Sequence, residues 1–572
     1  MAADDHDDDD DLEDEFAAFE REAKAAAAAA MSGMAAGAKA KDEEKPVEQA
    51  EVPAPVEDVE EDDEEDEFAA FEREAKAAAA TAMGSMGGGA SGGEAKASDN
   101  TKAEDAPSEA ATPEGASPED NAAPVDRDKL AKEAALAAAA GKVAAKSEEI
   151  FGTNAGAKSQ TILVVGGGIA GVTAAIEAAE TGYDVVLLEK GPALGGRVTM
   201  INRYFPKMCH PNCGLEINYQ RIRKNPRVKI ITMAEVTDVT GTMGDFTVSV
   251  TRQPSYVSGL CDGCGQCAEA SESKVSNDYN YGMDEVKAAH LPHEHAFPMQ
   301  YVIHPSVKGT PEEEKITASC AKGAIDFTME EESFELNAGA IIWATGWKPY
   351  NPSKLDVYSY DMSPDIINNV EMERLSAHDG PTEGKIVRPS DGEPAKRVAL
   401  IQCAGSRDIN HLAYCSMICC LASLKHAAYI REQYEDAEVD IYYIDIRAHD
   451  KMSQFYERVR RDEAINFIKS KPGHIKLGED GKPVVCGELT IDREIYQNPY
   501  DLVVLATGME SSLSPDFAPA GMVRDDYGFV IDSDGHYAAG TAGGPFDVAL
   551  STQSATAAAL KAIQAVNGRG LE

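Results

Sequence analysis

Residues 161–190 contain the feature that most restricts the fold of this chain. An apolar run typical of a buried strand is followed by Gly166-x-Gly168-x-x-Gly171, an Ala-rich helical stretch, and a second apolar run that ends at Glu189. Gly166 allows a tight turn, Gly168 lets a pyrophosphate approach the backbone, and Gly171 permits close packing of helix and strand. Glu189 can accept hydrogen bonds from both hydroxyls of a ribose. The complete pattern predicts a dinucleotide-binding βαβ unit.

The rest of the chain from Gln160 onward indicates an α/β fold. Further apolar runs resemble buried parallel strands and are separated by helical patterns or long insertions. These runs are 185–189, 341–344, 398–401, 439–446 and 502–506.

Several segments resemble the flavoproteins with two dinucleotide-binding domains, of which thioredoxin reductase is an example, and this resemblance favours FAD over NAD. Leu194-Gly195-Gly196-Arg197 is similar to the GG(R) segment that lies along the flavin diphosphate in that superfamily. A strand followed by Ala-Thr-Gly occurs at 344–346 and at 506–508, where the superfamily ends its first FAD half and its second nucleotide domain. Residues 536–541 are similar to the last strand and turn of the FAD domain, with Thr541 in place of the usual Asp that binds the ribityl chain. Val236 stands where the superfamily contacts adenine through its backbone. The expected cofactor-binding residues are Gly166, Gly168, Ile169, Ala170, Gly171, Glu189, Lys190, Gly196, Arg197, Val236, Ala344, Thr345, Gly346, Gly540 and Thr541.

The second nucleotide-binding turn has a different chemistry. After the run 397–402, the turn reads Cys403-Ala-Gly-Ser-Arg407-Asp408, so the first glycine is a cysteine and a bulky Arg407 stands where pyrophosphate would approach. NAD(P)H binding is therefore not expected here. A helix from about Tyr414 would place Cys415 and Cys419 on one face with Cys420 beside them. The four thiols Cys403, Cys415, Cys419 and Cys420 suit an iron–sulfur cluster or zinc, the alternative being buried structural thiols.

A second group of cysteines lies between the two halves of the nucleotide-binding pattern. Cys261, Cys264 and Cys267 form C-x2-C-x2-C, and Cys320 begins a CAKGAI turn. Bacterial ferredoxins combine such a run with a distant fourth cysteine, although their usual proline is Ala321 here. We expect a [4Fe–4S] cluster, with zinc as the alternative.

Three cysteines remain outside the two groups. Cys209 and Cys213 form a C-x3-C pair that is either a redox-active disulfide near the flavin or, as we favour, a structural or free pair. Cys486 is expected as a small apolar residue in a strand. The insertion's four histidines, which are expected in a solvated loop rather than as metal ligands, are His290, His293, His295 and His304.

The N-terminal part of the chain differs in composition from the remainder. Residues 1–125 are rich in Ala, Asp, Glu, Gly, Ser and Pro, and DEFAAFEREAKAAAA occurs at 14–28 and again at 66–80. We expect a disordered acidic head whose repeats are docking helices or a solvated tail. The net charge of −46 argues against nucleic acid or an anionic membrane surface as a direct partner. No apolar run is long enough to span a bilayer, and a cytoplasmic location is the default.

Taken together, GGGIAG, LGGR, CDGCGQC with CAKGAI, CAGSRD with YCSMICC, and AGTAGGPFDVALSTQSATAA resemble the flavoprotein family of the heterodisulfide reductase A-subunits. The segment FPKMCHPNCGLEIN is more similar to the branch represented by the A-subunit of the quinone-interacting membrane-bound oxidoreductase (Qmo). This resemblance covers about residues 160–570. It implies FAD and iron–sulfur centres, here two [4Fe–4S] clusters, in a multi-subunit complex.

The same resemblance implies a role, partners and a location. Electrons would pass between the menaquinone pool and adenylylsulfate reductase in dissimilatory sulfur metabolism. The partners would be a quinone-reactive membrane subunit together with a second flavin and iron–sulfur subunit, which would hold this chain at the cytoplasmic face of the inner membrane. The alternatives are a soluble heterodisulfide-reductase-type subunit with possible flavin-based bifurcation, an NAD(P)H-dependent disulfide reductase that uses Cys209 and Cys213, and a zinc-stabilised assembly subunit.

The expected organisation is an α/β two-dinucleotide-binding-domain flavoprotein with a ferredoxin-like insertion and an acidic extension. Its parts are the head (1–125), a helical linker (126–158), the first FAD part (159–250), the inserted iron–sulfur segment (251–335), the end of the first FAD part with a connector (336–395), a degenerate second nucleotide domain (396–508) and the second FAD part (509–572).

Overall fold

The computed structural model describes residues 158–568. The expected acidic head, its two repeats and all but the end of the helical linker lie outside the described residues. Within the described part of the chain, no helix is both long and apolar enough to cross a membrane.

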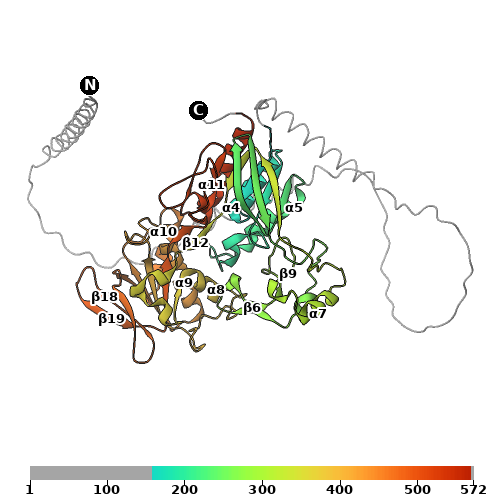
Figure 1. The fold of residues 1–572 in the computed structure, drawn as a ribbon. Helices are drawn as coiled ribbons and strands as arrows, with labels where there is room; N and C mark the ends of the chain where they lie inside the picture. Colours follow the sequence, from blue (N-terminus) through green and yellow to red (C-terminus); the bar gives the residue numbers. More distant parts are fainter. Residues whose placement is uncertain (1–157, 569–572) are drawn as a thin grey trace, which may run out of the picture. The chain divides into compact units, whose positions relative to one another are not determined.

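The first dinucleotide-binding unit is built on a five-stranded parallel sheet (Figure 1). Its order is β24 (His536–Ala538), β11 (Ala340–Trp343), β1 (Ile162–Val165), β2 (Val185–Leu188) and β3 (Val228–Ile231). Three helices pack together on one face, namely α4 (Ile169–Glu180), α5 (Asn212–Lys224) and α11 (Val548–Val566). The strands expected at 161–165, 185–189 and 341–344 are therefore confirmed.

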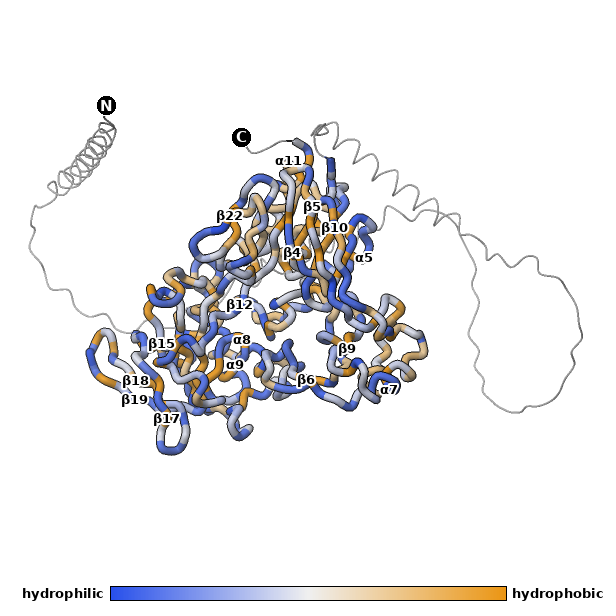
Figure 2. The backbone as a smooth tube through the Cα atoms, in the orientation of Figure 1, coloured by the Kyte–Doolittle hydropathy of each residue, from blue (hydrophilic) through white to orange (hydrophobic). Residues whose placement is uncertain are grey.

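The other face of this sheet is covered by a three-stranded antiparallel sheet. Its strands are β4 (Ala234–Thr242), β5 (Asp245–Arg252) and β10 (Glu332–Ala338), in the order β10-β5-β4. Side chains alternate along β1: Ile162 and Val164 pack among the helices, whereas Leu163 packs against Val248 and its neighbours. This period of two follows from strand geometry, and Figure 2 shows hydrophobic stretches along β4, β5 and β10.

The chain leaves this antiparallel sheet after Arg252 and returns to it at Glu332. The segment in between has its own small core. Its elements are α6 (Gln266–Ala270), β6 (Lys274–Ser276), η2 (Asp278–Asn280), β7 (Glu285–Lys287), β8 (Ala289–His290), β9 (Val302–Ile303), η3 (Pro305–Val307) and α7 (Pro311–Ser319). These elements are short, so side-chain packing rather than a long sheet holds the segment together.

A second parallel sheet contains the strands expected at 398–401, 439–446 and 502–506. Its order is β13 (Ile366–Asn368), β20 (Leu502–Thr507), β14 (Arg397–Ala404), β15 (Glu438–Tyr443) and β16 (Ile465–Lys469). One face packs on α8 (Asn369–Ser376), α9 (Cys419–Gln433) and α10 (Lys451–Arg460). The opposite core includes residues of β17 (His474–Leu477) and β18 (Pro483–Glu488). These strands form a small antiparallel sheet with β19 (Ile495–Pro499) in the order β17-β18-β19. Cys486 is buried in β18, as expected.

Short elements join the two sheets and complete the fold. The antiparallel ribbon of β12 (Trp347–Pro349) and β21 (Met509–Ser511) follows the two Ala-Thr-Gly segments. The remaining short elements are η1 (Gly196–Met200), η4 (Pro352–Lys354), η5 (Asp356–Tyr358), η6 (Tyr360–Met362), β22 (Val523–Arg524), β23 (Val530–Ile531) and η7 (Gly540–Ala542).

Candidate cofactor cavity and cysteine groups

The glycines of the first turn are required by steric crowding. A Cβ on Gly166, whose φ is +109°, would lie 2.3 Å from the carbonyl oxygen of Ala344. A Cβ on Gly171 would lie 1.8 Å from the carbonyl oxygen of Gly166, so α4 can approach β1 only without a side chain there. At Gly168, by contrast, the nearest atom to such a Cβ would be the Cα of Gly196, 4.0 Å away. The open side of Gly168 therefore leaves room for a ligand, as in dinucleotide sites.

Glu189 lies at the end of β2 and is held by two backbone amides. Gly167 N–H donates to Oε2 and Gly191 N–H donates to Oε1, both at 2.6 Å. Burial raises the pKa of Glu189 although these hydrogen bonds oppose the shift. A carboxylate offers about four acceptor positions, so the fixed side chain retains capacity for ligand hydroxyls.

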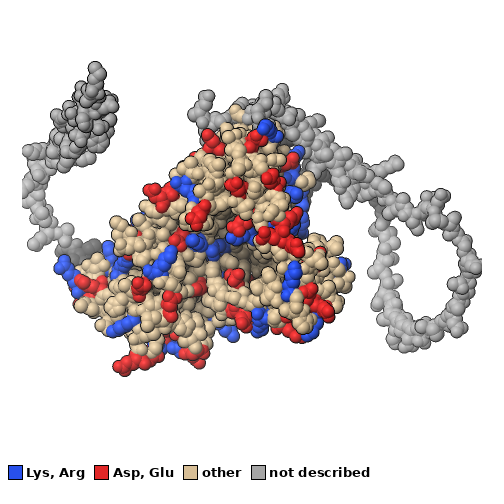
Figure 3. All heavy atoms as spheres, viewed as in Figure 1, with Lys and Arg blue, Asp and Glu red and all other residues tan. Residues whose placement is uncertain are grey.

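A cavity of about 1960 Å³ opens beside this turn. It exceeds the roughly 300–1,000 Å³ of ordinary ligand pockets. Of the expected cofactor-binding residues, all but Gly171 and Gly540 line it. Gly540 instead packs on α4, because its Cβ would lie 2.6 Å from the Cβ of Ala170. The molecule is visibly hollowed in Figure 3.

The polar groups of this cavity fit a dinucleotide. The Oγ1 of Thr345 is buried and has no hydrogen-bond partner among the described residues, and it belongs to the cavity lining. Thr541, at the position of the superfamily's Asp, also lines the cavity. A buried hydroxyl without a partner is costly, so a bound ligand that supplies one would stabilise this site.

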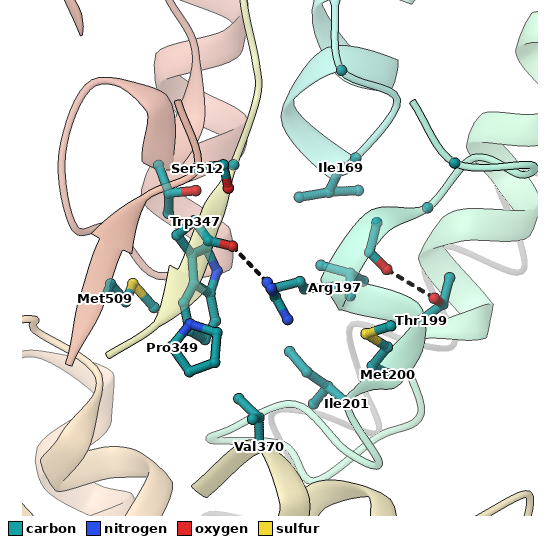
Figure 4. A pocket seen from close by; sticks show the side chains of 18 of the residues that line it. Ile169, Arg197, Thr199, Met200, Ile201, Trp347, Pro349, Val370, Met509 and Ser512 are labelled. Atoms are coloured by element: carbon teal, nitrogen blue, oxygen red, sulfur yellow. Dashed lines mark hydrogen bonds between the residues drawn. The ribbon is translucent and has the colours of Figure 1, made fainter. Parts of the chain in front are cut away.

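Sequence reasoning missed several residues that line the cavity. Tyr279, Tyr281, Trp347 and Glu373 belong to the lining, and the first two come from the segment between β5 and β10. Figure 4 shows Trp347 facing Arg197 across the cavity, with Val370 and Met509 nearby. No local pattern marks these residues, because they reach the cavity from distant parts of the chain.

The first cysteine group converges in space. Cys261, Cys264, Cys267 and Cys320 all line one small cavity of about 20 Å³. Burial, with smaller contributions from the neighbouring thiols Cys261 and Cys264, raises the pKa of Cys267 to about 11. The backbone N–H of Ala324 donates to the sulfur of Cys320 at 3.3 Å.

The loop around this group depends on glycines. Gly263, Gly265 and Gly323 have φ values of +75°, +83° and +63°, a region that favours glycine. Four thiols around one cavity supply the donor atoms of an iron–sulfur cluster or of zinc, although no three of them are arranged for a single metal ion in the part of the chain that the structure describes.

The second cysteine group also gathers at one place. Burial raises the pKa of Cys419 well above its usual value, and the nearby thiols Cys403, Cys420 and Cys415 add to the shift. Cys403 is at the end of β14 with φ of +57°, and its pKa is raised by burial and by Cys415, against the opposing charge of Arg407. These four thiols likewise fit a cluster, although no group of three or more His, Cys, Asp or Glu residues within 158–568 is arranged for a single metal ion.

The helix that contains these cysteines starts later than expected. The sequence predicts it from about Tyr414, but α9 begins at Cys419, and Cys415 lies in the preceding loop. The carbonyl of Tyr414 accepts a hydrogen bond from Arg407 N–H at 3.0 Å, and Met417 has φ of +57°. A left-handed residue cannot belong to a right-handed helix. Cys415 therefore approaches Cys419 through loop geometry and not through an i,i+4 helix face.

The second turn holds Arg407 and Asp408 in ion pairs. Arg407 Nη1 lies 2.6 Å from Asp445 Oδ1, and Lys471 Nζ lies 2.8 Å from Asp408 Oδ2. A Cβ on Gly405 would lie 2.6 Å from the ring of Tyr350. This turn is therefore closely packed by Tyr350, and its two charged side chains are already paired with Asp445 and Lys471.

The remaining candidate thiols and histidines are divided between surface and cavity. Cys209 and Cys213 are both exposed free thiols, and only Cys209 lines the large cavity. His295 and His304 are exposed, as expected of a solvated loop. That expectation is wrong for His290 and His293, which are half-buried. Burial lowers the pKa of His293 to about 4, and its ring stacks on Tyr279.

Comparison with known proteins identifies the family. Residues 161–346 match the family described as FAD dependent oxidoreductase. The chain is 37% identical over 421 residues to the second iron-sulfur A-subunit of CoB–CoM heterodisulfide reductase from Methanopyrus kandleri, covering 71% of this chain and 64% of that protein. It is 33% identical over 457 residues to the iron-sulfur A-subunit of CoB–CoM heterodisulfide reductase from Methanocaldococcus jannaschii, covering 76% and 68%. The chain belongs to the heterodisulfide reductase A-subunit family. It is thus a member of an oxidoreductase family, as the motifs predicted.

Two further comparisons define the extent of this similarity. The A-subunit of the ferredoxin/F420H2-dependent CoB-CoM heterodisulfide reductase from Methanosarcina acetivorans is 35% identical over 445 residues, covering 74% of this chain and 55% of that protein. The chain therefore spans less than two thirds of the length of the first relatives it matches. Among solved structures, Lactococcus lactis thioredoxin reductase aligns with a TM-score of 0.39 at 15% identity, covering 71% of this chain and 99% of that one.

Proposed function

We propose that this chain is the FAD- and iron–sulfur-containing electron-transfer subunit of a multi-subunit oxidoreductase complex. The observation that supports it is the presence, in one fold, of a dinucleotide-sized cavity behind a G-x-G-x-x-G turn and of two convergent groups of four thiols. The names of the relatives describe iron–sulfur subunits of heterodisulfide reductases. A flavin exchanges electrons singly or in pairs, whereas a cluster exchanges one, so the chain would convert between two-electron and one-electron transfer.

The proposed ligand sets follow the two cysteine groups. Cys261, Cys264, Cys267 and Cys320 would hold one [4Fe–4S] cluster, and the group that includes Cys403 would hold the other. The FAD would occupy the large cavity, with its pyrophosphate at Gly168 and its adenosine ribose at Glu189.

We further propose the narrower role implied by the sequence resemblance. The chain would relay electrons between the menaquinone pool and adenylylsulfate reductase in sulfur metabolism. A quinone-reactive membrane subunit, together with a second flavin and iron–sulfur subunit, would hold it at the cytoplasmic face of the inner membrane. Co-purification from the native source tests this role: a complex that lacks any membrane protein would instead support a soluble heterodisulfide-reductase-type assembly.

Anaerobic purification with iron, sulfide and flavin analysis tests the cofactor content. Two four-iron clusters require roughly eight irons with matching sulfide, together with one FAD per chain. Zinc without iron would instead support a zinc-stabilised assembly subunit. Bleaching of the flavin by NADH in the isolated chain would support a disulfide reductase that uses Cys209 and Cys213.

Two substitutions test the ligand sets separately. Cys267→Ala and Cys403→Ala should each lower the iron content by about half, from roughly eight to roughly four atoms, while FAD is retained. Cys486→Ala is the matched control, since Cys486 is an equally buried cysteine in β18 outside both groups. Full iron content in Cys403→Ala would show that this assignment is wrong.

A further inference from the structure

The turn formed by η2 and Tyr281 belongs to the segment between β5 and β10, yet it packs on η1, the short helix that begins at Gly196. Tyr279 Oη donates to the carbonyl of Thr199 in η1 at 2.5 Å. Tyr281 Oη lies 3.4 Å from the sulfur of Met200, also in η1. The inserted segment is thus hydrogen-bonded to the backbone and side chains of the wall of the cofactor cavity.

A buried arginine fixes this turn from the other side. Arg374 of α8 is 1% exposed, and its Nε donates to Asn280 Oδ1 at 2.8 Å. Its guanidinium lies 4.4 Å from the centre of the Tyr279 ring and donates to the carbonyl of Met200 at 3.4 Å. An ion pair of 2.7 Å with Asp379 balances its charge. These contacts fix the turn between η1 and α8 in the folded chain.

Arg197 is held between the turn and the strand β12. Its Nε donates to the carbonyl of Trp347 at 2.5 Å, and its Nη1 donates to Tyr281 Oη at 2.7 Å. Its guanidinium carbon lies 5.1 Å from the Trp347 ring and 5.6 Å from the Tyr281 ring, distances typical of cation–π contacts. Figure 4 shows the side chain directed across the cavity toward Trp347.

The guanidinium of Arg197 has no ion-pair partner among the described residues. No carboxylate there forms an ion pair with it, and its two hydrogen-bond acceptors are neutral oxygens. A guanidinium has five N–H donors in a fixed fork, and those not used by Trp347 and Tyr281 have no partner within residues 158–568. A half-buried cation that lines a cavity and has no carboxylate of residues 158–568 within ion-pair distance favours a ligand with negative charge.

We propose that Tyr281 is a positioning residue that aims the Arg197 guanidinium into the cofactor cavity, so that the inserted cysteine-containing segment helps to set the reduction potential of the bound flavin. This inference rests on the proposed flavin site. Uptake of two electrons and one proton leaves a flavin with one negative charge, and a fixed positive charge in the cavity stabilises that state. Tyr281 acts only through Arg197, because its hydroxyl accepts one of the two hydrogen bonds that hold the guanidinium.

The experiment uses the FAD-loaded full chain and measures the flavin midpoint potential in an anaerobic dithionite titration. Tyr281→Phe keeps the ring and removes only the hydroxyl, and it should lower the equilibrium constant for flavin reduction about tenfold, which is about 30 mV for a two-electron couple. Arg197→Gln should lower it at least as much. Tyr281→Phe in the Arg197→Gln background should add nothing, because the hydroxyl then has no cation to hold.

Tyr256→Phe is the matched control. Tyr256 lies in the same inserted segment, is 5% exposed and stacks on Phe327, but it does not line the large cavity. If Tyr281→Phe releases FAD, the same comparison is made on the FAD dissociation constant, which should rise at least tenfold over that of Tyr256→Phe.

The outcomes separate the two proposals. A wild-type protein without flavin would overturn the proposed function. A flavin-containing protein in which Tyr281→Phe and Tyr256→Phe behave alike, or in which Tyr281→Phe still lowers the potential without Arg197, would overturn only the positioning role.

Discussion

A buried ion pair beside the cavity gives the sharpest stability prediction. Lys425 Nζ of α9 lies 2.8 Å from Glu373 Oε1 of α8, and the two side chains are only 4% and 8% exposed. His426 Nε2 lies 2.6 Å from the same oxygen, and the backbone N–H of Asn202 donates to the other at 3.0 Å. Glu373→Gln removes the anion but keeps the size of the side chain. Lys425 is then left as a buried charge without its partner.

The expected loss of unfolding free energy depends on the burial of the pair and not on its N–O distance, because an exposed pair elsewhere in the chain has the same distance. Breaking a buried ion pair from one side costs about 3–5 kcal/mol of unfolding free energy. The pair of Lys315 and Glu272 has the same 2.8 Å separation but is 54% and 72% exposed, and such a pair contributes little because solvent screens its charges. Glu272→Gln is therefore the matched control, and the two variants should differ by about 3 kcal/mol.

Urea denaturation of the cofactor-loaded protein, followed by circular dichroism, measures this difference. Glu373→Gln should shift the midpoint strongly to lower urea and Glu272→Gln hardly at all. The double variant Glu373→Gln/Lys425→Met should be more stable than Glu373→Gln alone, because it no longer buries an unpaired charge. Equal midpoints for Glu373→Gln and Glu272→Gln would refute the reasoning. A double variant that is no more stable than Glu373→Gln would refute it as well.

Two further predictions concern the first turn and acid stability. Gly171→Ala should abolish FAD binding, measured as flavin content after purification, because its Cβ would lie 1.8 Å from a backbone oxygen; Gly214→Ala, with nothing within 4 Å, should retain full flavin. Burial alone would raise the pKa of Glu373, but the charges and hydrogen bonds of Lys425 and His426 together outweigh it and hold that pKa at about 2 against an ordinary 4.5. The stabilisation by ionised Glu373 is thus complete above about pH 4.5 and is lost as the pH falls toward 2. Burial lowers the pKa of His426, so this residue favours acid unfolding already below pH 6.5. Unfolding free energies measured from pH 7 to pH 3 should fall for the wild type and fall less below pH 4.5 for Glu373→Gln; parallel curves would contradict this assignment.

The sequence was sufficient where function depends on local chain geometry. The turn at Gly166 could be predicted because the close approach of α4 to β1 leaves no room for a side chain at Gly166 and Gly171. Only glycine fits at these two positions, and their spacing in the sequence is fixed. The grouping of Cys261, Cys264 and Cys267 is also local, since their spacing and positive-φ glycines bring three thiols together within seven residues. The predicted start of α9 was wrong because hydrogen bonds between two parts of the preceding loop keep Cys415 outside the helix, which begins only at Cys419, and periodicity does not report such bonds.

Only the tertiary structure decided which distant residues complete the cavity. Arg197 meets Tyr281 and Trp347 across 84 and 150 positions of sequence, and Glu373 meets His426 across 53. Each of these residues would be ordinary on its own element, and it gains a role only when two sheets and an inserted segment pack together. The alternation of side chains and the chemistry of turns act over a few residues, so the sequence by itself determined the strands, the glycine turn at Gly166 and the spacing of the thiols. The arrangement of charges around the cofactor cavity was determined by contacts that exist only in the folded chain.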